Sequence, residues 1–286
     1  MPEVEGVEHR FVSAGGLRMH VAEAGSGPPL VLLHGWPQHW WMWRKLIGPL
    51  AETQRVLAVD LRGFGWTAAP PDGYDPLVFA RDIEALLDAL EIDEPVDLAG
   101  HDWGGWTSFM LALQRPERVR RLLALNILHP FTRSSPASFK HAWRFWYQWP
   151  LAAPAILPRL DRLAGRLEPS LAWVGGREAG WDETERRVFV SQFEEPARAT
   201  AAALLYRHAV TKLLPDATRG RWRQSRLEVP ALLLFGDADR VQHPDLLPGY
   251  ERNAPQMELE LVPGVGHFIV DEVPDLVLDR ARAFFA

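Results

Sequence analysis

Apolar residues follow two spacings along the first half of the chain, and the two spacings alternate. Short continuous apolar runs that end at glycine-containing turns predict buried strands at residues 29–34, 55–61, 95–99 and 119–127. Between them, apolar residues recur every three or four positions, which predicts helices at 82–91 and 104–114. Continuous apolar strands separated by helices indicate a mostly parallel sheet that is covered on both faces.

This alternation stops near residue 130 and resumes near residue 225. The segment between them has helix-like stretches, many prolines and aromatic residues, and no buried-strand pattern. Further strands are predicted at 231–235 and 257–262, and an amphipathic helix at 274–285. The expected architecture is an α/β core made of residues 1–129 and 225–286, into which a helical cap of residues 130–224 is inserted.

Composition and charge mainly exclude classes of partner and of site. The chain has 286 residues, a formal net charge of −6 and scattered basic residues, which do not favour nucleic acid or an anionic membrane as a partner. It has no cysteine, so disulfides and thiolate metal sites are excluded. The acidic N-terminal stretch does not resemble a signal peptide, and no apolar run is long enough to span a bilayer. We therefore expect a cytoplasmic protein.

One turn carries the first chemical signal. The predicted strand 95–99 is followed by Gly100-His101-Asp102-Trp103-Gly104. In a strand-to-helix turn of the form glycine-x-nucleophile-x-glycine, the central side chain is exposed above the sheet. Asp102 occupies that central position, and no serine of the chain lies in such a frame. Taken alone, Asp102 fits equally well as a helix N-cap, a position that aspartate favours.

Two later positions change that balance. Asp237 and Asp239 follow the predicted strand 231–235, and His267 follows the last predicted strand. A single aspartate or histidine after a strand is usually only a loop residue. Here, however, a nucleophile, an acid and a histidine follow three strands in the chain order of a known type of hydrolytic triad. This order favours a catalytic role for Asp102.

The motifs resemble those of the epoxide hydrolase and haloalkane dehalogenase branch of the α/β-hydrolase superfamily. They are His34-Gly35-Trp36-Pro37, Asp60-Leu61-Arg62-Gly63-Phe64-Gly65, the glycine-rich turn at 100–105, and Gly266-His267. The turn, with Arg115-Pro116-Glu117-Arg118-Val119 after it, most resembles epoxide hydrolases. The resemblance covers residues 15–130 and 225–286. It implies the α/β-hydrolase fold, with a mostly parallel twisted sheet, helices on both faces and an inserted cap.

The resemblance also implies a mechanism that opens an epoxide to a vicinal diol. Asp102 would attack a saturated carbon and form an alkyl ester, which water activated by His267 would hydrolyse. The family places the acid of the catalytic triad three residues after a glycine and five before a proline. Asp239 satisfies both conditions, whereas Asp237 is expected to be a turn residue. The backbone N–H groups of Trp36 and Trp103 would form the oxyanion hole.

Two cap residues of the family, usually tyrosines, donate hydrogen bonds to the epoxide oxygen. Tyr206 in Leu205-Tyr206-Arg207 matches one of them. The other slot holds Arg144, with Tyr147 three positions later on about the same helical face. Either Tyr147 substitutes, or Arg144 is the donor, or Tyr206 acts alone. Ordinary core packing of Tyr147 is also an open alternative.

Tryptophan is frequent, with 13 residues, and suggests an aromatic substrate cavity. Trp36 and Trp103 flank the nucleophile by motif position. Trp143, Trp146 and Trp149 recur every three residues and are expected to give the first cap helix an aromatic side. We expect Trp36, Trp103, Trp143 and Arg144 to bind substrate, which would be a small hydrophobic molecule. Trp40, Trp41 and Trp43 are expected to pack in the core or against the cap.

No metal or organic cofactor is implied. His34 and His101 both lie at strand ends, but no acidic residue stands at ligand spacing, so buried hydrogen-bonded roles are expected for both. A homodimer is left open as the assembly.

Two alternative functions remain. A haloalkane or haloacid dehalogenase would use the same aspartate, and the indole N–H groups of Trp36 and Trp103 are suited to bind halide. Haloacid-type relatives place an arginine directly after the nucleophile, where this chain has Trp103, although Arg144 could hold an anion. A non-catalytic small-molecule binder is disfavoured because the nucleophile, acid and histidine positions are all filled.

Overall fold

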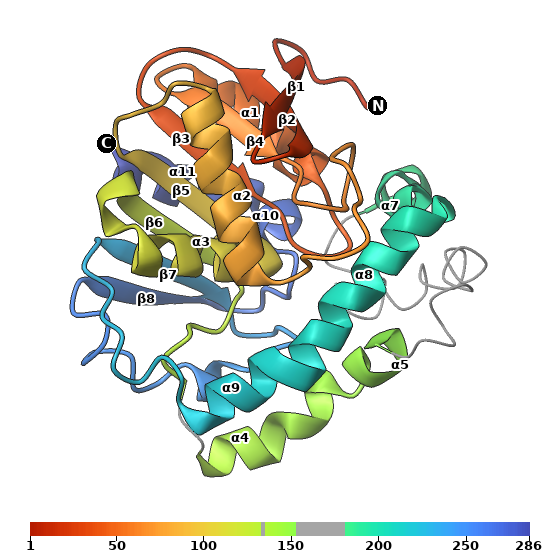
Figure 1. The fold of residues 1–286 in the computed structure, drawn as a ribbon. Coiled ribbons are helices and arrows are strands. Elements are labelled where there is room, and N and C mark those ends of the chain that lie inside the picture. The colour runs from red at the N-terminus through yellow and green to blue at the C-terminus, as the bar shows by residue number, and fades with distance from the viewer. Residues whose placement is uncertain (133–134, 153–180) are drawn as a thin grey trace.

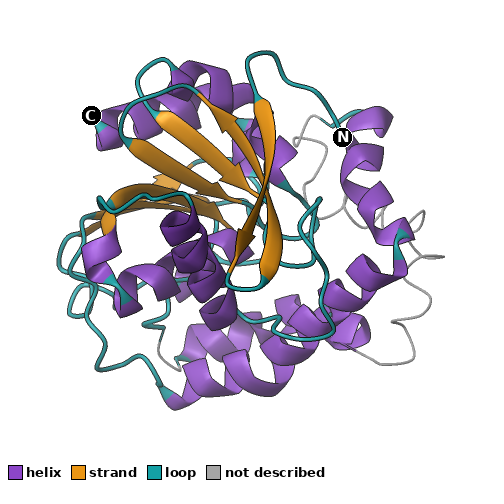
Figure 2. Ribbon diagram, turned by 45° about the horizontal axis from the view of Figure 1, so that its top comes forward, coloured by secondary structure: helices purple, strands orange, loops and turns teal. Residues whose placement is uncertain are grey.

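The computed structural model describes residues 1–132, 135–152 and 181–286, and these residues contain one eight-stranded sheet (Figure 1, Figure 2). The strands are β1 (Glu8–Ala14), β2 (Leu17–Ala24), β3 (Pro29–Leu33), β4 (Arg55–Val59), β5 (Val96–His101), β6 (Val119–Leu125), β7 (Ala231–Gly236) and β8 (Met257–Val262). Their order in the sheet is β1-β2-β4-β3-β5-β6-β7-β8. β1 and β2 pair antiparallel, as do β2 and β4, and all later pairs are parallel. The prediction of a mostly parallel sheet is confirmed.

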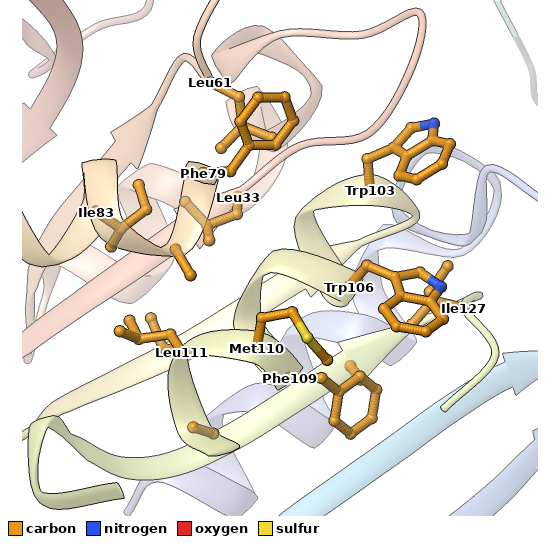
Figure 3. Packing of buried hydrophobic residues seen from close by; sticks show 14 of the residues in the cluster. Leu33, Leu61, Phe79, Ile83, Trp103, Trp106, Phe109, Met110, Leu111 and Ile127 are labelled. Atoms are coloured by element: carbon orange, nitrogen blue, oxygen red, sulfur yellow. The ribbon is translucent and has the colours of Figure 1, made fainter. Parts of the chain in front are cut away.

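Helices cover both faces of the sheet, which explains the continuous apolar strands. They are α1 (Arg44–Ala51), α2 (Pro76–Ala89), α3 (Trp103–Gln114), α10 (Ile269–Glu272) and α11 (Pro274–Phe285). Val31 and Leu33 of β3 belong to the same buried cluster as α2 and α3 (Figure 3). Leu30 and Leu32 belong to the cluster that contains α1 and α11. Alternate residues of one strand thus enter two separate cores, so every position has to be apolar.

The first two strands were not predicted, and for β1 its exposure explains why. β1 is mostly exposed or half-buried, and only Ala14 in it is buried. Such a strand has no continuous apolar run. The hairpin turn that joins β1 to β2 contains Gly15 and Gly16, both at positive φ (54° and 81°), a region that favours glycine. The turn chemistry, rather than the hydrophobic pattern, is the sequence signal for this hairpin.

The segment between β6 and β7 contains helices and no strand among the residues that the structure describes. It contains α4 (Pro136–His141), η3 (Ala142–Phe145), α5 (Gln148–Ala152), α7 (Glu183–Val190), η6 (Ser191–Glu194), α8 (Pro196–His208), the π-helical segment η7 (Ala209–Leu213) and α9 (Leu214–Arg219). Figure 1 shows α8 and α9 in one continuous run, with α5 beside α8. We refer to these described helices as the insert.

A proline explains the π-helical turn. Pro215 lies one residue into α9, and a proline there has no N–H to donate to the preceding turn and crowds its carbonyl. The wider turn of η7 directly precedes it. π-Helical turns are often found at functional sites, and this one faces the cavity described below.

The order of the strands determines where a site can form. β3 lies between β4 and β5, so the chain reverses its direction of progress across the sheet at this point. In open α/β sheets, ligands bind outside the carboxyl ends of the strands at such a switch point. The segments after β3 and β5 contain Trp36 and Asp102, respectively. No helix among the described residues is both long enough and apolar enough to cross a membrane.

Candidate active site

Asp102 stands on a strained turn between β5 and α3. Its φ is 50° and its ψ is −119°, a conformation that residues other than glycine rarely adopt. The turn is tight because a side chain on Gly104 would collide with the backbone of Leu33, and one on Gly100 with the backbone of Gly104. Asp102 makes no side-chain capping bond to α3. The geometry is therefore that of an exposed-nucleophile turn and not that of an N-cap.

Backbone N–H groups hold the Asp102 carboxylate. The N–H of Trp36 donates to Oδ1 of Asp102 at 3.0 Å, and the N–H of Trp103 also donates to this carboxylate. Asp102 is only 8% exposed. Burial raises the pKa of Asp102 above its ordinary value, although the charge on His267 and the two N–H groups act in the opposite direction. The two donors predicted for the oxyanion hole thus lie on the predicted nucleophile.

His267 lies between the two predicted carboxylates. Its Nδ1 is 2.9 Å from Oδ2 of Asp239, and its Nε2 is 3.7 Å from Oδ2 of Asp102. Burial on its own lowers the pKa of His267. The charge and hydrogen bond of Asp239 and the charge of Asp102 outweigh this effect and raise that pKa to about 9. The structure thus brings Asp102, His267 and Asp239 together in the arrangement that a triad requires.

Asp239 and Asp237 have different environments, as the sequence predicted. Asp237 is exposed and accepts the backbone N–H of Gly264, which makes it a turn residue. Asp239 is buried and accepts the backbone N–H groups of Val241 at 2.6 Å and Gln242 at 3.0 Å. Although burial raises the pKa of Asp239, these bonds and the charge on His267 bring it below its ordinary value. Asp239 therefore stays ionised and can orient His267.

Asn126 is a site residue that the sequence reading missed. It directly follows β6, is fully buried, and has a positive φ of 41°. Its Nδ2 donates to Oδ2 of Asp239 at 2.9 Å and to the carbonyl of Gly266 at 3.0 Å, and its Oδ1 accepts the N–H of Gly236. One amide thus connects three loops of the site. The available sequence signal was an asparagine, which tolerates positive φ, at the end of an apolar strand.

Two tyrosines of the insert lie next to the nucleophile turn. The ring of Tyr206 on α8 packs edge-on against the rings of Trp36 and Trp103, with centroid distances of 5.3 and 5.9 Å. The ring of Tyr147 is 5.9 Å from that of Tyr206, and the two side chains hydrogen-bond to each other. Burial is the largest effect on both phenols and raises both pKa values well above the ordinary value. Both hydroxyls are therefore protonated donors near Asp102.

Arg144 and Trp143 lie elsewhere. Arg144 donates to the backbone carbonyls of Asp239 at 3.2 Å and Arg240 at 3.0 Å, and does not line the cavity. Trp143, Trp146 and Trp149 are 59%, 58% and 65% exposed, so the expected aromatic side of the cavity is wrong for all three. The three-residue spacing, which in the 3₁₀ turn η3 places side chains on one face, does not show whether that face is buried, and here it is exposed.

A cavity of about 80 Å³ lies between the nucleophile and the insert. Its polar lining residues are Asp102, Trp103, Thr132, Tyr147, Gln148 and Gln242, and its apolar wall includes Trp106, Ile127, Phe145, Ala209 and Leu213. Figure 3 shows Trp103 at the start of α3 and Trp106 one turn later, beside Ile127. Ala209 and Leu213 belong to the π-helical turn. The cavity is thus enclosed by both the core and the insert.

His34 and His101 make buried hydrogen bonds to backbone groups near the site. Nε2 of His34 accepts the N–H of Leu61 at 3.0 Å, and Nε2 of His101 lies 2.8 Å from the carbonyl of His267. Burial lowers the pKa of His101 to about 3, so this ring is neutral and donates to the carbonyl. Buried hydrogen-bonded roles are confirmed for both residues.

The comparisons with known proteins agree with this geometry. The family model for the alpha/beta hydrolase fold matches residues 28–274. A soluble epoxide hydrolase of Corynebacterium sp. (strain C12) is 30% identical over 286 residues, which cover 98% of each chain. A fluoroacetate dehalogenase of Burkholderia sp is 30% identical over 293 residues, which cover 97% of this chain and 92% of that protein. The crystal structure of an epoxide hydrolase from Vigna radiata has a TM-score of 0.82 at 27% identity and covers 99% of each chain.

The family match spans most of the chain, and the relatives align over nearly its full length. The chain belongs to the α/β-hydrolase family and is an epoxide hydrolase-like hydrolase.

Proposed function

We propose that this protein hydrolyses an epoxide to a vicinal diol through an alkyl ester on Asp102. The observation that carries this proposal is the pair of protonated tyrosines, Tyr147 and Tyr206, next to the carboxylate. An epoxide ring opens more easily when a donor stabilises the charge that develops on its oxygen. Relatives named as epoxide hydrolases, at about 30% identity, support the same reaction class.

In the first half-reaction, Oδ2 of Asp102 attacks a ring carbon. Oδ1 accepts the N–H of Trp36 at 3.0 Å, whereas Oδ2 is the oxygen that lies 3.7 Å from Nε2 of His267. A new C–O bond forms to Asp102 as the ring C–O bond breaks. The ring oxygen takes a hydrogen bond and then a proton from the tyrosine pair. A carboxylate is suited to this step because it is ionised at neutral pH.

In the second half-reaction, water attacks the carbonyl carbon of the ester. Alkylation removes the negative charge of Asp102, which is one of the effects that raise the pKa of His267. His267 then passes its proton to the tyrosinate left by the first half-reaction and becomes a neutral base that takes a proton from water. The oxyanion forms on Oδ1, where the Trp36 N–H already donates, and the Trp103 N–H donates to the same carboxyl group. The ester C–O bond breaks, the leaving oxygen takes the proton of the new carboxyl group, and the diol leaves. Asp102 is again a carboxylate, with its new oxygen from water, and His267 is again protonated.

A dehalogenase is the second candidate, because one buried group suits a halide. Among the residues that the structure describes, the buried Nε1 of Trp36 has no hydrogen-bond partner, while the Trp103 side chain hydrogen-bonds to Tyr206. The indole N–H of Trp36 is therefore available for a leaving halide. Against a haloacid, Arg144 is engaged with two backbone carbonyls and is not placed to hold a substrate carboxylate.

Intact mass spectrometry of His267→Gln distinguishes the two reactions. This variant should still be alkylated but should not hydrolyse the ester, so the adduct accumulates. We expect a mass gain equal to a whole epoxide after incubation with small epoxides. An alkyl adduct without its halogen, formed only from haloalkanes, would support the dehalogenase instead. The double variant Asp102→Asn/His267→Gln is the control and should form neither adduct.

A further inference from the structure

Three potential metal ligands meet at the outer contact between the insert and the core. His141 is the last residue of α4, while His243 and Asp245 lie at the short 3₁₀ helix η8 (Pro244–Leu246), which follows β7. Each of the three offers one ligand atom within 4.8 Å of the others. Nε2 of His141 is 2.9 Å from Oδ2 of Asp245, and Nδ1 of His243 is 3.5 Å from the same oxygen.

These spacings fit one metal ion. Zinc binds imidazole nitrogen and carboxylate oxygen at about 2.0–2.2 Å with tetrahedral geometry, which places its ligand atoms about 3.4 Å apart. The two distances to Oδ2 lie on either side of this value. Nδ1 of His243 accepts the backbone N–H of Asp245 at 3.1 Å, so this nitrogen is not protonated, and an ion would have to displace that N–H from its lone pair. The two rings now stack 13° from parallel and would have to tilt toward the ion.

The donor set also selects the type of ion. Two imidazoles suit zinc, cobalt, nickel and copper, whereas calcium and magnesium require a shell of oxygen ligands. Two positive side chains are close: Lys140, whose Nζ is 3.3 Å from Oδ2 of Asp245, and Arg144, whose charge acts on His243. Lys140 is 69% exposed and can move away, but it competes with any ion for Asp245.

From this geometry we infer that His141, His243 and Asp245 form a binding site for a divalent transition-metal ion such as Zn²⁺. The ion would join α4 of the insert to the core, since His141 and Asp245 are 104 residues apart along the chain. The site lies outside the cavity that contains Asp102, and none of its three residues lines that cavity. The metal has a structural role and takes no part in the chemical steps above.

The test is zinc titration by calorimetry on the full chain without a histidine tag, after treatment with a chelator. We expect one Zn²⁺ per chain and a rise in Tm when zinc is added. Co²⁺ should give the visible absorption bands of tetrahedral coordination. His141→Ala should lose more affinity than the about 10- to 100-fold cost of removing an outer-shell partner. His208→Ala, a matched change on α8 of the insert, should bind zinc as the parent does.

Lys140→Ala makes the test sharper, because it should act in the opposite direction. Without the competing ammonium, zinc affinity should stay equal or increase severalfold. Asp245→Asn, which keeps the side-chain shape, should weaken binding and guards against a misfolded His141→Ala protein. Equal zinc binding by the parent and by both ligand variants would overturn the assignment. So would a Lys140→Ala protein that loses zinc as His141→Ala does.

Discussion

The two halves of the active site are built differently. On the core side, backbone groups fix the reactive side chains: N–H groups of Trp36 and Trp103 hold Asp102, and those of Val241 and Gln242 hold Asp239. On the insert side, Tyr206 and Tyr147 are positioned mainly by ring packing and by one another. Backbone groups restrict a side chain to one geometry, whereas ring packing depends on neighbours far away in the sequence. The first half is therefore encoded in short motifs, and the second is not.

The largest effect should come from the core half. Asp102→Asn removes the nucleophile but keeps the shape of the side chain, and should lower kcat/KM for an epoxide by at least about 10⁴-fold. Because the pKa of Asp102 is raised by burial, removing its charge should not destabilise the fold. Steady-state kinetics of the freshly purified variant measure kcat/KM, and thermal unfolding measures its stability. Near-parental turnover by this variant would mean that Asp102 is not the nucleophile.

The insert half should show a smaller effect. Tyr206→Phe removes one donor to the epoxide oxygen and should slow alkylation by about 10²-fold, the scale for one oxyanion donor. Tyr147→Phe should act on the same step. Single-turnover adduct formation in a His267→Gln background isolates this step from ester hydrolysis. Trp143→Phe is the matched control, because this ring is 59% exposed and should leave the rate within about twofold.

Some features of the site could be predicted from the sequence, and others could not. The turn at Asp102 followed from its glycine spacing, which depends on local backbone geometry. The choice of Asp239 over Asp237 followed from the position of the acid in the family that the chain resembles. The placement of Trp143 was wrong because a three-residue spacing shows which side chains share a face but not which face is buried. In the 3₁₀ turn η3, side chains three positions apart lie on the same face, and here that face is exposed.

The fold shows the same contrast. The apolar strands were predicted from their continuous runs, since strands buried on both faces need apolar residues throughout. The first turn of α2 was missed, although Asp75 caps it by accepting the N–H groups of Leu77 and Val78. Asn126 was missed because its role depends on partners more than 100 residues away. No local pattern specifies such a contact.

A variant of Asn126 measures how far this long-range contact in the core half of the site supports catalysis. Asn126→Ala removes a donor to Asp239 and should destabilise the protein by about 1–3 kcal/mol. It should also slow ester hydrolysis about tenfold while alkylation stays close to parental, because His267 loses part of its support. Asn253→Ala is the matched control. That amide is buried and donates to two backbone carbonyls away from the cavity, so only stability should fall. Equal slowing of both half-reactions by Asn126→Ala would contradict a role specific to His267.

The smallest effect concerns pH. The pKa of His267 in the folded protein is raised to about 9 from an ordinary 6.5. A raised pKa contributes stability that is fully present below pH 6.5 and is lost as the pH rises through about 9. Stability should therefore decline across this window, and less so in Asp102→Asn, where one charge that raises the pKa is missing. Denaturant unfolding from pH 6 to 10, with ring resonances of His267 by NMR, measures both effects. An unchanged His267 pKa in Asp102→Asn would show that the two groups are not coupled.

The central claim is that an ester on Asp102 is hydrolysed by attack at its carbonyl carbon. A single turnover of excess enzyme with a small epoxide in oxygen-18 water tests it directly. If the ester forms, the diol oxygens come from the epoxide and from Asp102, and the peptide that contains Asp102 gains one oxygen-18. If the label instead appears in the diol of the first turnover and Asp102 stays unlabelled, water has attacked the epoxide directly, and the proposed mechanism is wrong.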